Sequence, residues 1–205
     1  MHRSIILFIL LLAAWAPSFA AQPHIPFIRY GVEWGSSGTL YTSKHQNYTV
    51  SEGYRVDDNH AGWTFIGNAQ VLANIGVNIT PRIAVAAYTG LEGISKDFRV
   101  IPLTLRGTYY FKDMDFDGML CYFDGGVGFK GIRNPSEICT LLSAGTGYHM
   151  ALSSSVSLDF LLSARASLDS PDIVDPDTGR ALPESSIRLN QARFYSVNIS
   201  IALNF

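Results

Sequence analysis

The sequence predicts an all-β protein, folded as an eight-stranded antiparallel up-and-down transmembrane β-barrel. Three observations support this fold class. Apolar residues alternate with small polar ones, with a period of two, in eight successive segments. Only 16% of the residues are charged, against about 25% in soluble domains. Beyond the N-terminal region no apolar run approaches the length of a transmembrane helix, so strands are the elements that could cross a membrane.

The N-terminal region is expected to be a signal peptide that covers residues 1–20. His2 and Arg3 precede a run of twelve apolar residues, and small residues lead up to a cleavage point after Ala20. The run is shorter than the ~20 residues of a membrane-spanning helix. The barrel domain is therefore expected over residues 21–205.

The alternation defines eight predicted strands. They cover residues 28–35, 64–79, 82–90, 100–111, 120–130, 140–150, 156–167 and 194–205. In the first, isoleucine, tyrosine, valine and tryptophan share one face, and arginine, glutamate and glycine share the other. The second sets alanine, valine and isoleucine against mainly asparagine and glutamine, and it ends in a tight turn at Thr80, Pro81 and Arg82. The third alternates branched apolar residues with small ones, as a half-buried strand does.

The remaining strands repeat the pattern. In the fourth, leucine and aromatic residues share a face, and Pro102 is the weak point because proline cannot donate to a ladder. The fifth opposes phenylalanine and valine to tyrosine, aspartate and glycine, and the sixth is the least regular. The seventh sets leucine and alanine mainly against serine, and the eighth is the most regular of all. Eight strands of this length are typical of the smallest outer-membrane barrels.

The composition of the polar face favours a membrane barrel over a soluble one. A soluble barrel would turn that face to water and carry many lysines and glutamates there, whereas glycine, serine, threonine and asparagine predominate here. Aromatic residues lie near the strand ends, as they do at membrane interfaces. The net charge of -2 provides no basic surface for nucleic acid.

The last strand resembles the C-terminal signal that the bacterial barrel-assembly machinery reads. The residues that carry the resemblance are Tyr195, Val197, Ile199, Ile201, Leu203 and Phe205. As a pattern, the whole mature chain resembles the small eight-stranded outer-membrane barrels, the OmpA-like transmembrane barrels among them. The resemblance implies a place in the cell outer membrane, contact with its lipid, and insertion by that machinery. It implies no particular activity.

Connection lengths alternate along the chain, with two long loops expected over residues 36–61 and 168–192. Short turns at one rim and long loops at the other are typical of outer-membrane barrels, whose short side faces the periplasm. Binding residues concentrate on loops that a rigid scaffold carries. These two loops are therefore the expected sites for an extracellular protein or glycan.

The polar face is expected to place seven charged residues inside the barrel. They are Arg29, Glu33, Arg106, Asp124, Lys130, Asp159 and Arg165. Because an isolated buried charge costs several kcal/mol or more, they should pair into a plug that fills the interior. A thin polar path for ions or small solutes is the alternative hypothesis.

An acidic turn contains Asp113, Asp115 and Asp117 before a glycine, in the spacing that opens a calcium loop. The segment links two strands, however, and the twelfth position of the loop would be Asp124, which belongs to the predicted interior. We therefore expect a plain acidic turn and no cofactor, with Ca²⁺ as the weaker alternative.

Catalysis would need a base, and the best placed histidine is His149, at the end of the sixth strand with Ser157 across the turn. The eight-stranded lipid A deacylases carry a histidine and a serine two residues apart on a late strand, but residues 161–167 contain no histidine. No catalytic residue is therefore expected. The leading hypothesis is a non-enzymatic barrel that braces the envelope or presents its loops for adhesion or recognition. A narrow pore comes second, and a lipid-modifying hydrolase third.

Overall fold

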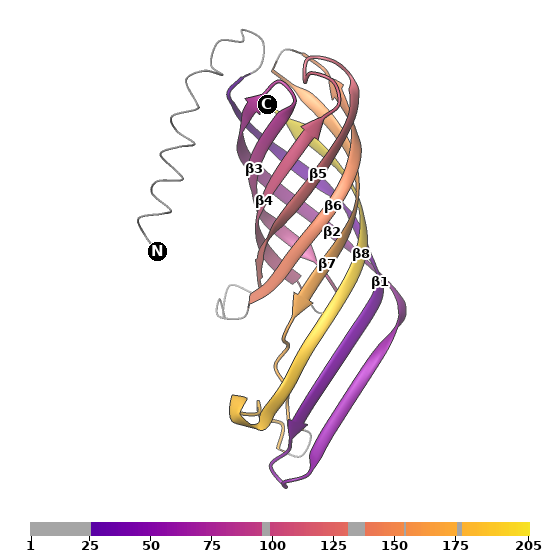
Figure 1. Ribbon diagram of the computed structural model, residues 1–205, viewed down its shortest axis with the longest axis vertical. Helices are drawn as coiled ribbons and strands as arrows, with labels where there is room; N and C mark the ends of the chain where they lie inside the picture. Colours follow the sequence, from indigo (N-terminus) through magenta and orange to yellow (C-terminus); the bar gives the residue numbers. More distant parts are fainter. Residues whose placement is uncertain (1–25, 96–98, 131–137, 154, 176–177) are drawn as a thin grey trace, which may run out of the picture.

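The protein forms a closed ring of eight antiparallel strands in the computed structural model, which describes residues 26–95, 99–130, 138–153, 155–175 and 178–205 (Figure 1). The strands are β1 (Ile28–Thr49), β2 (Arg55–Thr80), β3 (Ile83–Gly93), β4 (Arg99–Tyr110), β5 (Gly118–Phe129), β6 (Ile138–Ala151), β7 (Ser157–Asp169) and β8 (Ile187–Asn204). Each strand pairs with its neighbours in sequence, and β8 closes the ring on β1. The predicted up-and-down barrel is confirmed, while the expected signal peptide lies outside the described residues.

Helical structure is almost absent from the described residues. One turn of 3-10 helix, η2 (Glu184–Ser186), precedes β8. Within the described ranges, no helix is long and apolar enough to span a bilayer.

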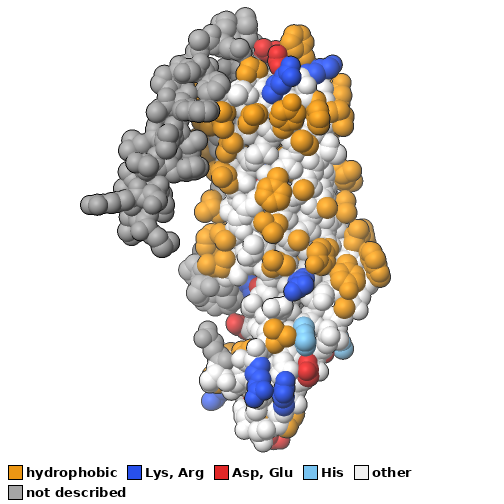
Figure 2. Space-filling view, in the orientation of Figure 1, with side chains coloured by type: hydrophobic (Ala, Val, Ile, Leu, Met, Phe, Trp, Pro, Cys, Tyr) orange, Lys and Arg blue, Asp and Glu red, His pale blue; other side chains and the backbone are white. Residues whose placement is uncertain are grey.

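The strands present their large apolar side chains outward, which is the reverse of a soluble barrel. In β8, Ile199 is 65% exposed, whereas Asn198 and Ser200 on either side of it are buried. On the face that Figure 2 shows, hydrophobic side chains are spread over the barrel wall, and charged ones gather at the two ends of the molecule. Soluble monomers rarely expose so extensive an apolar surface. The barrel wall is therefore a lipid-facing surface.

The two ends of the barrel differ. The connections 81–82, 111–117 and 152–156 lie at one end, here called the turn end, together with the C-terminus (Figure 1). Phe205 closes the ring there, because its backbone exchanges hydrogen bonds of 2.8 and 3.1 Å with Tyr30. The rings of the two residues also stack at 5.6 Å between centroids.

The other end carries a three-stranded extension in place of the first long loop. β1 and β2 continue as a paired hairpin to the connection 50–54, and β8 pairs with β1 from Ile187 onward. This extension projects beyond the other strands (Figure 1). The prediction of a loop over residues 36–61 is therefore wrong. The sequence of the extension has no apolar alternation that would mark a strand.

The second predicted loop, 168–192, is also shorter than expected, because β7 runs to Asp169 and β8 begins at Ile187. The part of the intervening segment around Ile173 and Asp175 packs on the extension. Ile173 and Val50 are both buried, and Ser51 donates hydrogen bonds to the buried carboxylate of Asp175. The extension and this segment thus form one folded unit.

A β-bulge marks the boundary between barrel and extension. The register of β1 shifts between Thr39 and Tyr41 against both neighbours. Leu40 is an extra residue against β8, whereas against β2 the extra residue lies on β2, where Thr64 and Phe65 face Leu40. A bulge bends its strand and increases the local twist. The bulge therefore directs the extension away from the cylinder of the barrel.

Candidate functional site

Arg106 on β4 occupies the centre of the barrel between two carboxylates. Its Nη1 lies 2.7 Å from Glu33 Oε2 on β1, and its Nε and Nη2 lie 3.0 and 2.8 Å from Asp124 Oδ2 on β5. The guanidinium carbon lies 4.1 and 4.2 Å from the ring centroids of Tyr88 and Tyr122, within range of cation–π attraction. All five side chains are buried.

Neighbouring polar residues complete this central layer. Ser200 and Gln70 donate to Glu33 Oε1 at 2.7 and 3.1 Å, and Ser143 donates to Asp124 Oδ1 at 2.5 Å. Together with Arg106 and the two tyrosines, these residues come from seven of the eight strands. The side chains of the central layer therefore fill the cross-section of the barrel, as expected for a ring of eight strands.

A glycine on β6 makes room for one of the two tyrosines. Gly145 lies opposite Tyr122 in the β5–β6 ladder. A Cβ added at Gly145 would lie 2.6 Å from Tyr122 Cζ and 2.6 Å from the carbonyl oxygen of Leu162. No larger residue fits there without moving either the ring or the backbone, so Gly145 sets the position of the ring beneath Arg106.

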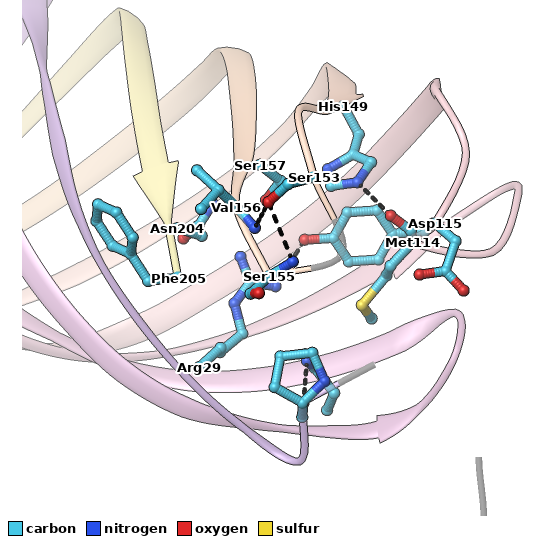
Figure 3. A pocket seen from close by; sticks show the side chains of 13 residues that line it. Arg29, Met114, Asp115, His149, Ser153, Ser155, Val156, Ser157, Asn204 and Phe205 are labelled. Carbon is cyan, nitrogen blue, oxygen red and sulfur yellow. Dashed lines mark hydrogen bonds between the residues drawn. The ribbon is translucent and has the colours of Figure 1, made fainter. Parts of the chain in front are cut away.

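A second cluster closes the turn end and centres on Asp159. Figure 3 shows three of its other members, Arg29, His149 and Asn204. The Asp159 carboxylate accepts hydrogen bonds from His149 Nδ1 at 2.6 Å and from Asn204 Nδ2 at 3.0 Å. Arg29 Nη2 lies 3.7 Å from the same carboxylate, and Arg29 Nη1 donates to the hydroxyl of Tyr110 at 2.7 Å. We call this group the rim cluster.

Both ring nitrogens of His149 are occupied. Besides Asp159, its Nε2 lies 2.8 Å from the carbonyl oxygen of Met114 (Figure 3). A carboxylate and a carbonyl can only accept, so each nitrogen carries a hydrogen and the ring is an imidazolium. In this arrangement His149 has no lone pair with which to take a proton from a nucleophile.

The hollow beside His149 is small. It encloses about 50 Å³, which is room for a few water molecules. Ser157 lines it, and so does Ser153, whose hydroxyl accepts hydrogen bonds from the backbone of Ser155 and Val156 in the turn (Figure 3). The serines therefore belong to a turn at the barrel mouth, and the hollow has no space for an acyl chain.

Two further ion pairs lie toward the extension end. Arg165 on β7 contacts Glu92 on β3, and Lys130 Nζ lies 2.5 Å from Asp169 Oδ1. Ile94, just after β3, is buried at this end, where its carbonyl oxygen accepts a hydrogen bond from Thr39 Oγ1 at 2.7 Å. Charge is thus paired along the whole length of the interior.

Positive and negative groups inside the barrel balance once His149 is counted as charged. The cations are Arg29, Arg106, Lys130, His149 and Arg165. The anions facing them are Glu33, Glu92, Asp124, Asp159 and Asp169. Five charges of each sign leave the described ion-paired interior neutral, which limits the energetic penalty of burying so many ions.

The structure places all seven sequence-predicted charges inside and brings five of them together in two groups. Arg106 joins Glu33 and Asp124, and Arg29 joins Asp159. Lys130 and Arg165 instead pair with residues that sequence reasoning missed. Those partners, Asp169 and Glu92, each lie two residues beyond the end of a predicted strand. The alternation of that strand, continued to them, places both side chains on the inward face. Extending the alternation by one step would have found them.

The acidic turn does not gather its carboxylates around one point. Asp113 pairs with Arg82 at 2.6 Å, and Asp117 accepts a hydrogen bond from the backbone of Ala151 at 2.9 Å. Asp124 lies in the central layer, and Asp115 lines the hollow at the rim. Among the residues that the structure describes, no three potential metal ligands converge.

The six residues of the predicted assembly signal all lie on the outer face of β8 or at its end. Val197 and Ile199 are exposed on the wall, and Phe205 stacks on Tyr30. Tyr195 packs against Tyr41 at 6.0 Å between ring centroids. The alternate residues of the predicted signal thus form a regular row on the lipid-facing surface.

Comparison with known proteins finds likeness in fold only. No protein-family model and no curated protein matches the chain. Among solved structures, the outer membrane protein OprG from Pseudomonas aeruginosa matches 89% of this chain and 97% of its own, with 9% identity and a TM-score of 0.46. Neisserial surface protein A matches 85% and 95%, with 12% identity and a TM-score of 0.42. The outer membrane protease OmpT from Escherichia coli matches 87% and 96%, with 10% identity and a TM-score of 0.43. At these levels of similarity, none of the three bears on what this chain does.

Proposed function

We propose that this chain is a non-enzymatic protein of the outer membrane, with a sealed interior and an extension that serves recognition outside the cell. The central layer is the observation that carries the proposal. Arg106 is held by Glu33 and Asp124 and covered by two tyrosine rings, so the middle of the barrel is filled with bonded side chains. A barrel closed in this way serves as a scaffold for whatever its ends present.

The apolar wall and the expected signal peptide support the outer-membrane location. The row that ends at Phe205 supports insertion by the barrel-assembly machinery, with membrane lipid as the partner of the wall. The occupied nitrogens of His149 and the small hollow beside it argue against a lipid-modifying enzyme. The ion pair between Asp113 and Arg82 supports a structural role for the acidic turn.

The extension supports the recognition role. Two polar side chains of its surface, Asp57 and Arg55, are held by the buried Asn47, which donates to Asp57 at 2.9 Å and accepts from Arg55 Nε at 2.8 Å. A hydrogen-bonded three-stranded sheet has little conformational entropy to lose on binding. Such a surface suits the recognition of a polar partner, a protein or a glycan.

Conductance across a planar lipid bilayer tests the sealed interior. We expect the wild type to give no steady current. A variant in which Arg106, Tyr88 and Tyr122 are all changed to alanine should conduct, because it empties the central layer. Leu105→Ala, which shortens an outward side chain beside Arg106, is the matched control and should give no steady current. Steady current through the wild type would refute the sealed interior.

The same measurement decides the second candidate function, a narrow pore. Both amide atoms of Asn74 and of Asn198 are buried without a hydrogen-bond partner in the described structure. Buried polar groups of this kind are usually satisfied by water. Water at these two sites would form short wet segments of the interior, and a current through the wild type would show that the segments connect.

A further inference from the structure

The outer wall of the barrel carries an apolar hollow of about 630 Å³. Its floor is made of small side chains, Ala144 on β6 and Ala164 and Ala166 on β7. These alanines are neighbours across the ladder, since Ala144 pairs with Ala164 and Ala166 pairs with Tyr195. Larger residues surround them, so the hollow is a depression in the lipid-facing surface.

An aromatic row borders the hollow on the side of the extension. Tyr195, Tyr41 and Trp63 are consecutive partners across β8, β1 and β2. The ring centroids of Tyr41 lie 5.6 Å from Trp63 and 6.0 Å from Tyr195. Tyrosine and tryptophan concentrate at the level of the lipid headgroups. The hollow therefore faces hydrocarbon, and the region beyond the aromatic row faces headgroups.

A polar groove of about 230 Å³ begins directly beyond the aromatic row. It is lined by Ser43, His45, Asn59, Gln191 and Arg193. Ser43 pairs with Arg193, and His45 pairs with both Gln191 and Asn59, so the groove crosses the same three strands. Because strand side chains alternate faces, Ser43 lies on the same face as Tyr41, about 7 Å farther along β1.

The hollow and the groove together have the polarity of a single amphipathic molecule. We propose that they bind one outer-leaflet lipid with a phosphorylated sugar headgroup. The acyl chains lie over the alanine floor and the headgroup lies in the groove. This inference rests on the outer-membrane location proposed above.

The side chains of the groove favour a sugar headgroup over a simple phospholipid. Arg193 is exposed and offers a planar donor fork that suits phosphate. Asn59 and Gln191 offer both donors and acceptors, which match hydroxyl groups. Asp57 lies 3.0 Å from His45 Nε2 and orients the histidine ring. One arginine among several neutral hydrogen-bonding groups suits a headgroup that is rich in hydroxyls.

Native mass spectrometry of the delipidated protein in detergent tests the inference. The probes are diphosphorylated hexa-acyl lipid A and phosphatidylglycerol, each titrated separately. We expect the wild type to bind lipid A about tenfold more tightly than phosphatidylglycerol, a difference of about 1.4 kcal/mol. Ala164→Phe fills the hollow and should weaken lipid A about tenfold or more. Arg193→Gln should weaken lipid A about tenfold and leave phosphatidylglycerol unchanged.

Two matched variants control for general effects. Ala87→Phe adds the same bulk to the outer face of β3, away from the hollow, and Arg188→Gln removes a charge from β8 that does not line the groove. Both should bind lipid A within about twofold of the wild type. Equal binding by the Ala164 and Ala87 variants, or equal binding of the two lipids by the wild type, would overturn the proposed site.

The failure of the site and the failure of the location give different results. Heat-modifiable migration on a gel reports whether each variant has formed its barrel. If Ala164→Phe does not fold, Arg193→Gln, which changes an exposed side chain, still decides the question. A wild-type protein that does not enter lipid vesicles contradicts the outer-membrane proposal. An inserted protein without preference for lipid A contradicts only the site.

Discussion

Replacing Arg106 with methionine leaves two carboxylates buried at the centre of the barrel without their cation. Arg106 donates three hydrogen bonds, one to Glu33 and two to Asp124. Breaking a buried ion pair by removing one partner costs about 3–5 kcal/mol. Ser200 and Ser143 still donate to the two carboxylates after the change. We therefore expect a loss near the lower end of that range, about 3 kcal/mol of unfolding free energy.

Urea-induced unfolding in lipid vesicles measures this loss. Trp34 and Trp63 are exposed on the outer face and report insertion by fluorescence. The decisive comparison is a triple variant in which Arg106→Met is combined with Glu33→Gln and Asp124→Asn. Because neutral side chains carry no such desolvation penalty, this variant should recover to within about 1–2 kcal/mol of the wild type. If the single and the triple variant are equally unstable, buried charge is not what Arg106 neutralises.

Three further predictions concern other parts of the barrel. Gly145→Val should destabilise the protein by about 1–3 kcal/mol, as overpacking does, because its Cβ would meet Tyr122 at 2.6 Å; unchanged urea midpoints would contradict this close approach. His149→Gln should leave the lipid A of expressing cells unaltered in mass spectra, because both nitrogens of the native ring are already bonded; a change that depends on His149 would restore the enzyme hypothesis. Phe205→Ala should slow the appearance of the heat-modifiable folded form in cells, since the stacking on Tyr30 is lost; assembly at the wild-type rate would remove Phe205 from the insertion signal.

The sequence predicts the barrel well where each strand separates lipid from a packed interior. β8 alternates without interruption from Tyr195 to Phe205, and that part was predicted at the right residues. The outer half of β1 was missed, because Ser36, Ser37 and Thr39 are compatible with a loop as well as with a strand. Pairing with β2 and β8 decides their conformation, and such pairing is not visible in local sequence.

The partners of the interior charges were harder to predict than their positions. The alternation of inward and outward residues along a strand places Arg106 and Arg165 inside, but it does not say which carboxylate each one contacts. That depends on the tilt and stagger of the strands around the whole ring. Arg165 contacts Glu92 on β3, which is not adjacent to β7 in the sheet. Only the closed barrel brings these two residues together.

The bulge at Leu40 also determines how copies of this protein can approach one another. Because the extension leaves the cylinder there, the described part of β2 before Gln70 pairs with β1 alone and leaves its other edge open. An open edge is a template for strands of other chains. Asp57 and Asp58 lie on this edge, and two copies aligned there would set like charges side by side. The same residues that offer a polar surface to a partner thus discourage the protein from polymerising through its own sheet.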